Sequence, residues 1–140
     1  MQWDDGHAGG FTTGTPWIEV NSNYMEINAG NAIKDADSIY NYYKQLIALR
    51  KKHKVIVYGA YELLLAEHTE IYAYTRTLED QRLLVILNFY DGEPVFEWPA
   101  EFQPENIELL ISNYSVEKDE QIQPLKLRPY EARVYLQQLV

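Results

Sequence analysis

The residues best suited to chemistry gather in the opening stretch, MQWDDGHAGGFTTGTPW. The rings of Trp3, Phe11 and Trp17 could stack on the apolar faces of sugars or pack beneath a loop. Asp4 and Asp5 are the paired carboxylates. Cleavage of a glycosidic bond needs two carboxyl groups about 5–5.5 Å apart for retention, or roughly 6.5–9.5 Å apart for inversion. Because adjacent residues of an extended chain point to opposite faces, we expect turn-forming or capping roles for these aspartates.

Other reaction types find little support in the sequence. His7, His53 and His68 are far apart and have no spacing typical of metal ligands, so we expect no metal site. Gly9-Gly10 precedes neither a helix start nor a lysine, which argues against a phosphate loop. No G-x-S-x-G stretch is present for a serine nucleophile. The sequence therefore predicts no cofactor.

Composition narrows the class of protein and its partners. The chain has 140 residues and a net charge of −9, from 21 acidic and 12 basic residues. Binding to phosphates needs clustered cations, so we expect neither a nucleic-acid nor a membrane partner. The absence of cysteine excludes disulfides and fits a reducing cytoplasm. No signal peptide is visible, and the longest apolar run, 83–87, is too short to span a bilayer.

The elements that must position the opening residues differ along the chain. Residues 1–35 show no helical or strand period, so we expect them to lack secondary structure, and they hold five of the seven glycines. This stretch is too aromatic for a disordered tail, so we expect its packing partners to lie outside this chain. Residues 37–53 follow with the period of an amphipathic helix. Asp37 or Ser38 is the expected N-cap, and cations close the helix, where they complement its dipole. One stripe of this helix, which we call the apolar stripe, carries Ile39, Tyr43, Leu46 and Ile47 and ends at Arg50.

From Val55 onward the period changes to two, which predicts strands. IYAYTRT alternates, RLLVILNFY suits a strand buried on both faces, and Asp91-Gly92 is a hairpin signal. PVFEWP, NIELLISNY and YEARVYLQQLV complete the series. In the last of these, Glu131, Arg133, Tyr135 and Gln137 should share one face. We predict a mainly β fold with a C-terminal antiparallel β-sandwich of Greek-key type.

The order of these motifs resembles one enzyme family along the whole chain. MQWDD, HAGGFTTGTPWIEVNSNYMEIN and DSIYNYYKQLIALRKKHKVIVYGAYELL are followed by IYAYTRT, LLVILNF and LRPYEARVY. This string is similar to the C-terminal quarter of alpha-glucosidases of the alpha-amylase superfamily. Bacterial oligo-1,6-glucosidases and trehalose-6-phosphate hydrolases are the most similar subfamilies. One departure is the pair Gly9-Gly10, where relatives usually have a single glycine before the phenylalanine.

The resemblance implies a division of the chain. Residues 1–54 would end a (β/α)₈ barrel, with 1–35 in the loop after strand eight and 37–53 as the last helix. Residues 55–140 would form the sandwich. Active sites of such barrels are built from the loops at the C-terminal face. Trp3, Asp5 and Phe11 are therefore our candidates for the rim of the substrate cleft.

The resemblance also implies a function. The parent would be a retaining glycoside hydrolase of bacterial cytoplasm that releases glucose from the non-reducing ends of short alpha-1,6-linked isomalto-oligosaccharides. The family's catalytic carboxylates lie on earlier strands and are absent here, so we expect this chain, as a fragment, to be inactive and to contain no catalytic residue. Its packing partner would be the barrel. Without it, residues 1–35 should be disordered and the apolar stripe could drive self-association.

Two alternatives stay open at this point. The parent could be a trehalose-6-phosphate hydrolase, because residues upstream distinguish the substrates. The sandwich could instead be a stand-alone carbohydrate-binding module. Such modules expose a planar row of aromatic rings, for which Tyr72, Tyr74 and Tyr135 are the candidates.

Overall fold

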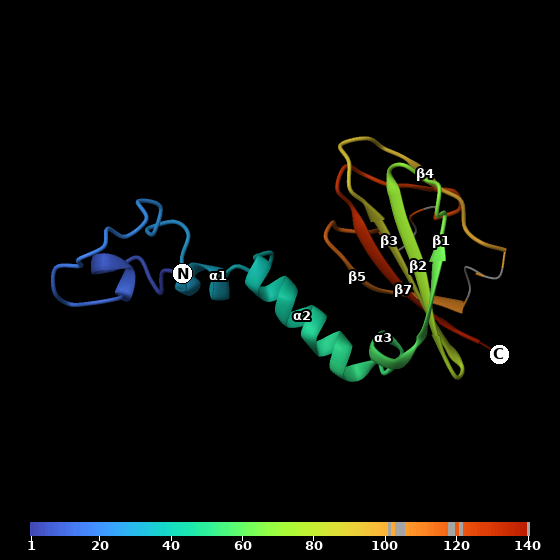
Figure 1. Cartoon of the computed structure of the whole chain (residues 1–140), viewed down its shortest axis with the longest axis horizontal. Helices are drawn as coiled ribbons and strands as arrows, with labels where there is room; N and C mark the ends of the chain where they lie inside the picture. Colours follow the sequence, from blue (N-terminus) through green and yellow to red (C-terminus); the bar gives the residue numbers. More distant parts are fainter. Residues whose placement is uncertain (101, 103–105, 118–119, 121, 140) are drawn as a thin grey trace. The chain divides into compact units, whose positions relative to one another are not determined.

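A computed structural model describes residues 1–100, 102, 106–117, 120 and 122–139. The chain divides into two compact units, Met1–Ala48 and Leu49–Val140, and the helix α2 (Ile39–Lys52) contains the boundary between them. Figure 1 shows the order of the elements along the chain. The first unit also holds the 3₁₀ helix η1 (His7–Gly10) and the helix α1 (Ala29–Lys34).

The helix α2 confirms the prediction for residues 37–53. Ser38 is its N-cap, because the Ser38 hydroxyl accepts a hydrogen bond from the backbone N–H of Asn41 at 3.2 Å. Arg50, Lys51 and Lys52 occupy the last turn, where positive charge favours the helix dipole. None of the side chains on α2 is buried. Its amphipathic sequence therefore presents an apolar stripe that the described residues leave uncovered.

The expectation that residues 1–35 lack secondary structure is wrong for two short segments. η1 and α1 both form there. Asn28 begins α1: its side-chain oxygen accepts from the backbone N–H of Asn31 at 2.8 Å, and its amide donates to the Tyr24 carbonyl at 2.9 Å. α1 contains no buried residue. A hydrophobic period could not reveal it, because a helix of 6 residues spans fewer than two turns.

The second unit is an antiparallel sandwich, as predicted. One sheet has five strands in the order β1-β2-β3-β7-β5, and a second sheet pairs β4 with β6. All the neighbouring strands are antiparallel. The strands are β1 (Ala60–Leu64), β2 (Ile71–Leu78), β3 (Gln81–Asn88), β4 (Val95–Phe96), β5 (Ile107–Ser112), β6 (Leu125–Lys126) and β7 (Ala132–Gln138).

The apolar core lies on both faces of the larger sheet. On one face, Leu84 and Ile86 of β3 pack with Phe96 and Leu125 of the smaller sheet. On the other face, residues 83 and 85 pack with Val55 of the short helix α3 (Val55–Tyr58). The prediction that RLLVILNFY is buried on both faces is therefore confirmed for the part within β3, whereas Phe89 and Tyr90 follow the strand and are exposed. The alternation predicted for β2 is also confirmed, with residues 71, 73 and 75 buried.

Three expectations for the second unit are wrong. Strand period was predicted from Val55, but residues 55–58 form α3, which ends with Gly59 N–H donating to the Val55 carbonyl at 3.0 Å. Fully buried Val55 fills the second core cluster, and this tertiary contact outweighs its β propensity. Asp91-Gly92 does not close a hairpin, because β4 pairs with β6 and not with β3. Tyr135 cannot belong to an exposed sugar-binding row, because it is 3% exposed and packs on Trp98.

Candidate functional site

The backbone of the opening loop is fixed around Trp3. Its N–H donates to the Gly9 carbonyl at 2.8 Å, and its carbonyl accepts from the Gly30 N–H at 2.9 Å. The Gln2 carbonyl accepts in the same way from Ala29 at 2.9 Å. Residues 2–3 thus lie between the turn at 6–10 and the start of α1. The Trp3 side chain stays 61% exposed, so the loop holds its backbone and presents its ring.

Asp4 organises the turn that follows. Its Oδ1 atom accepts a hydrogen bond from the Gly6 N–H at 2.9 Å, which is the Asx turn typical of aspartate. Gly10 has a φ of 76°, and a Cβ atom there would lie 2.9 Å from Asp4 Oδ2. Only glycine fits this position, because a side chain would be both strained and in contact with the carboxylate. The structure therefore gives Asp4 the turn-forming role expected for it.

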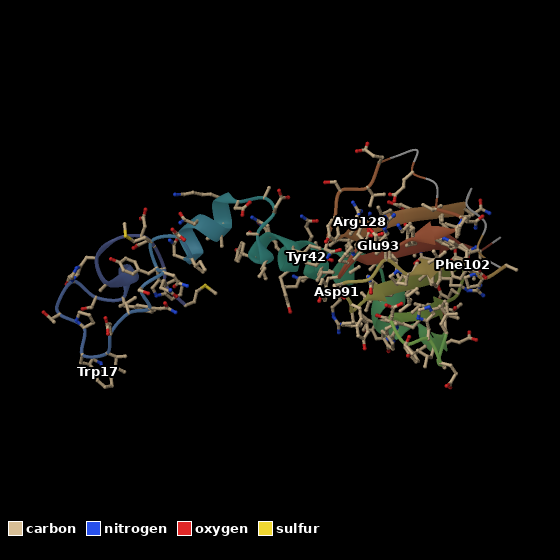
Figure 2. The ribbon with its side chains drawn as sticks, turned by 90° about the horizontal axis from the view of Figure 1, so that it is seen from above. Trp17, Tyr42, Asp91, Glu93, Phe102 and Arg128 are labelled. Atoms are coloured by element: carbon tan, nitrogen blue, oxygen red, sulfur yellow. The ribbon has the colours of Figure 1, made fainter. Side chains whose placement is uncertain are left out.

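The three candidate rim residues do not gather in one place. Phe11 is 53% exposed and lines an open hollow. Trp3 and Asp5 do not line this hollow. Trp17, which was not among the rim candidates, is 92% exposed and stands at the margin of the first unit in Figure 2. The hollow is lined by Asp4, Gly6, His7, Gly10, Phe11, Thr12 and Thr13.

Polar side chains and one aromatic ring, that of Phe11, line this hollow. The Asp4 carboxylate and the threonine hydroxyls can accept hydrogen bonds, and the Phe11 ring can stack on an apolar face. His7 is held by its Nε2 atom, 3.2 Å from the Gly14 carbonyl. Among the described residues, no three His, Asp or Glu side chains are grouped to hold a metal ion. The arrangement can hydrogen-bond a polar ligand and stack on an apolar face of it.

Sequence reasoning missed a buried cluster of charges in the second unit. Glu131 and Arg133 are both fully buried, and Arg133 also donates to the Tyr135 hydroxyl at 3.2 Å. Burial alone would raise the pKa of the Glu131 carboxyl, but hydrogen bonds from Arg128 and Arg133 outweigh it and lower the pKa. The alternation of YEARVYLQQLV placed these residues correctly on one face. Their burial left no signal, because charged residues in strands usually mark the exposed face.

Two family models match successive parts of the chain. Residues 1–59 match the family model "Alpha amylase, catalytic domain", and residues 61–134 match "Maltogenic Amylase, C-terminal domain". The oligo-1,6-glucosidase of Parageobacillus thermoglucosidasius is 53% identical over 96% of this chain and 24% of that protein. The trehalose-6-phosphate hydrolase of Bacillus subtilis is 43% identical over the same shares.

Solved structures of related enzymes also match nearly the whole of this chain. The crystal structure of Bacillus licheniformis trehalose-6-phosphate hydrolase is 42% identical, with a TM-score of 0.85 over 98% of this chain and 25% of that one. The chain thus spans about a quarter of the length of the relatives it matches. No helix in the described part of the chain is long and apolar enough to cross a membrane. The chain therefore belongs to the alpha-amylase superfamily, with a maltogenic amylase C-terminal domain over residues 61–134 that follows the end of an alpha-amylase catalytic domain.

Proposed function

We propose that this chain supplies the end of the barrel and the C-terminal sandwich of a retaining alpha-glucosidase. The parent enzyme releases glucose from the non-reducing ends of short alpha-1,6-linked isomalto-oligosaccharides in the bacterial cytoplasm. The identity of 53% with an oligo-1,6-glucosidase supports this substrate over trehalose 6-phosphate, whose hydrolase from Bacillus subtilis is 43% identical. Residues 1–54 belong to the barrel and residues 55–140 to the sandwich.

The uncovered apolar stripe on α2 is the observation that carries the proposal. Ile39 is 80% exposed, Tyr43 is 62% exposed and Ile47 is 50% exposed. Complete burial of an isoleucine contributes roughly 1.5–3 kcal/mol, so three exposed apolar side chains on one helix leave a large stabilisation unrealised. A catalytic barrel packed against this helix would bury them. In its absence we expect the isolated chain to self-associate through the same stripe.

The chemistry of the parent divides between this chain and the rest of the enzyme. The catalytic carboxylates come from the rest, so the isolated chain is inactive. Trp3, Asp5 and Phe11 border the substrate cleft, where the rings stack on sugar and the carboxylate accepts hydrogen bonds from hydroxyl groups. Their exposure in the isolated loop supports this role: Trp3 is 61% and Phe11 53% exposed.

A stand-alone carbohydrate-binding sandwich is the second candidate. Tyr72 and Tyr74 do stand on one sheet face, and Tyr61 joins them with its hydroxyl 3.0 Å from that of Tyr72. The ring planes of Tyr61 and Tyr74 are inclined by 38°, and those of Tyr72 and Tyr74 by 52°. The three rings therefore form no flat row. This geometry favours a face that packs on the barrel.

Kinetics of the full-length enzyme test the proposal. Phe11→Ala should raise KM for isomaltotriose and leave kcat nearly unchanged, because a rim contact binds ground state and transition state alike. Tyr58→Ala is the matched control, since Tyr58 is an exposed aromatic residue of α3. An unchanged KM in the Phe11 variant would remove this residue from the cleft.

A further inference from the structure

Three exposed aromatic rings lie at the end of the sandwich where β3 ends and β7 begins. We call Phe89, Tyr90 and Tyr130 the aromatic surface; they are 62%, 51% and 60% exposed. Their loops are joined directly, because the Tyr130 N–H donates to the Tyr90 carbonyl at 3.0 Å. Figure 2 labels Asp91 and Arg128, which neighbour these loops, at one end of the sandwich.

The backbone of Tyr130 has a conformation that suits glycine. Residues 128–131 form a β-turn closed by the Glu131 N–H donating to the Arg128 carbonyl at 3.2 Å, and Pro129 occupies its second position. Tyr130 follows with a φ of 54°. Proline at the second position and a positive φ at the third are typical of a type II turn. Such a turn favours glycine or asparagine at its third position, and a bulky residue there is strained. Since its side chain is mostly exposed, burial in the core does not offset this strain. Such strain gathers at functional sites.

Two asparagine side chains, buried Asn88 and exposed Asn113, hydrogen-bond the loops that carry the aromatic surface. Asn88 is 4% exposed, accepts from the Tyr90 N–H at 3.0 Å and donates to the Arg128 carbonyl at 2.9 Å. Asn113 donates to the Tyr130 carbonyl at 2.9 Å. The loops that carry the rings are therefore fixed from several sides. A ligand that binds between loops with a fixed backbone loses little free energy to the ordering of those loops.

We propose that the aromatic surface is an accessory binding site for short, neutral oligosaccharides of glucose. Exposed Tyr and Phe rings stack on the apolar faces of sugars, and tyrosine hydroxyls add hydrogen bonds. The neighbouring cation is already engaged: Arg128 pairs with Glu131 at 2.7 Å and stacks on the Tyr114 ring at 4.4 Å. A neutral sugar therefore suits the surface better than a phosphorylated one. The choice of glucose oligomers rests on the proposed function.

Titration of the full 140-residue chain with isomaltotriose, followed by amide NMR, tests this site. The amides of residues 89, 90 and 130 should shift in a saturable way. Tyr130→Gly should weaken binding about tenfold or more, because it removes a stacking ring. The same change should keep or raise the melting temperature, because glycine fits the turn. Tyr130→Phe should keep most of the binding, and Tyr58→Ala is the control for a distant exposed tyrosine.

Four binding results would overturn the proposal, and so would one stability result. The binding results are the absence of shifts, shifts centred on Tyr61 and Tyr72, unchanged binding by the Tyr130→Gly variant, and tighter binding of trehalose 6-phosphate than of isomaltotriose. A fall in the melting temperature of Tyr130→Gly would also count against it, because the ring would then serve the fold. Hydrolysis by the full-length enzyme is measured separately, so the failure of this site and the failure of the proposed activity are distinguishable.

Discussion

Nε of Arg133 lies 2.7 Å from Oε1 of Glu131, with both side chains fully buried in the sandwich. Glu131 also accepts from the backbone N–H of Arg128 at 2.7 Å, and Arg133 reaches Glu120 at 2.8 Å. Each buried charge therefore has charged or hydrogen-bonding partners. The cluster ties the last strand to the turn before it and to the segment that contains Glu120.

Replacing Arg133 by methionine should strongly destabilise the sandwich. Among the described residues the change leaves buried Glu131 with Arg128 as its one charged partner. Breaking a buried pair costs about 3–5 kcal/mol. Chemical denaturation measures the loss. Lys126→Met is the matched control, because the Lys126–Glu93 pair is 64% and 54% exposed and should contribute only about 0–1 kcal/mol. Equal, small losses in both variants would contradict the account.

Acid should unfold the sandwich through Glu131. Its pKa is lowered in the folded state because hydrogen bonds from Arg128 and Arg133 outweigh the effect of burial. A lowered carboxyl pKa contributes stability above its unfolded value, about 4.3, and that stability is lost as the pH falls through the folded pKa. We expect the free energy of unfolding to fall below about pH 4.3. In Glu131→Gln this part of the pH dependence should disappear, and its persistence would assign the acid sensitivity to another group.

A second pH dependence should come from His53, in a separate range. Burial and the charge of Lys52 lower the pKa of its imidazole, and Glu108 opposes them. His53 is 8% exposed, and its Nε2 atom has no hydrogen-bond partner among the described residues. The folded state therefore binds the proton less readily than the unfolded state, so stability should fall as the pH drops from about 6.5. Unfolding measured between pH 8 and pH 5 should show a shallower slope in His53→Gln, and an equal slope would refute this assignment.

Gly59 should tolerate no larger residue, although its φ of −61° is ordinary. A Cβ atom there would lie 2.6 Å from the Val55 carbonyl oxygen and 3.0 Å from Arg76 Cβ. Gly59→Ala should lower the free energy of unfolding by about 1–3 kcal/mol, because the backbone must move. Gly14→Ala is the control, since the nearest atom there is 3.7 Å away. A melting temperature unchanged by the Gly59 substitution would contradict this, because the backbone at the end of α3 would then move at little cost in free energy.

Periodicity was a sufficient guide wherever burial is one-sided or complete. The alternation of residues 71–76 and the apolar run of β3 follow from it directly. An amphipathic period also predicted α2, although none of its side chains is buried in this chain. Periodicity failed at Val55, whose burial in a tertiary cluster favours a helical turn. The hairpin signal at Asp91-Gly92 also failed, because a local turn signal carries no information on which strand pairs with β4.

Less of the candidate site than of the fold could be predicted from the sequence. The turn-forming role of Asp4 follows from residue type, and the hydrogen bond to Gly6 confirms it. The roles of Trp3, Asp5 and Phe11 stay predictions, because a rim is defined by the barrel loops that face it. The expected disorder of residues 1–35 also stays a prediction, for amide exchange to test. The strain at Tyr130 was invisible, since nothing in LRPYEARVY marks a residue with positive φ.

The rate of glucose release by the full-length enzyme tests the central claim most directly. Purified enzyme is assayed side by side with isomaltotriose and with trehalose 6-phosphate, and kcat/KM is compared. The proposed function predicts a clear preference for isomaltotriose. A preference for trehalose 6-phosphate, or hydrolysis of neither substrate, would contradict it.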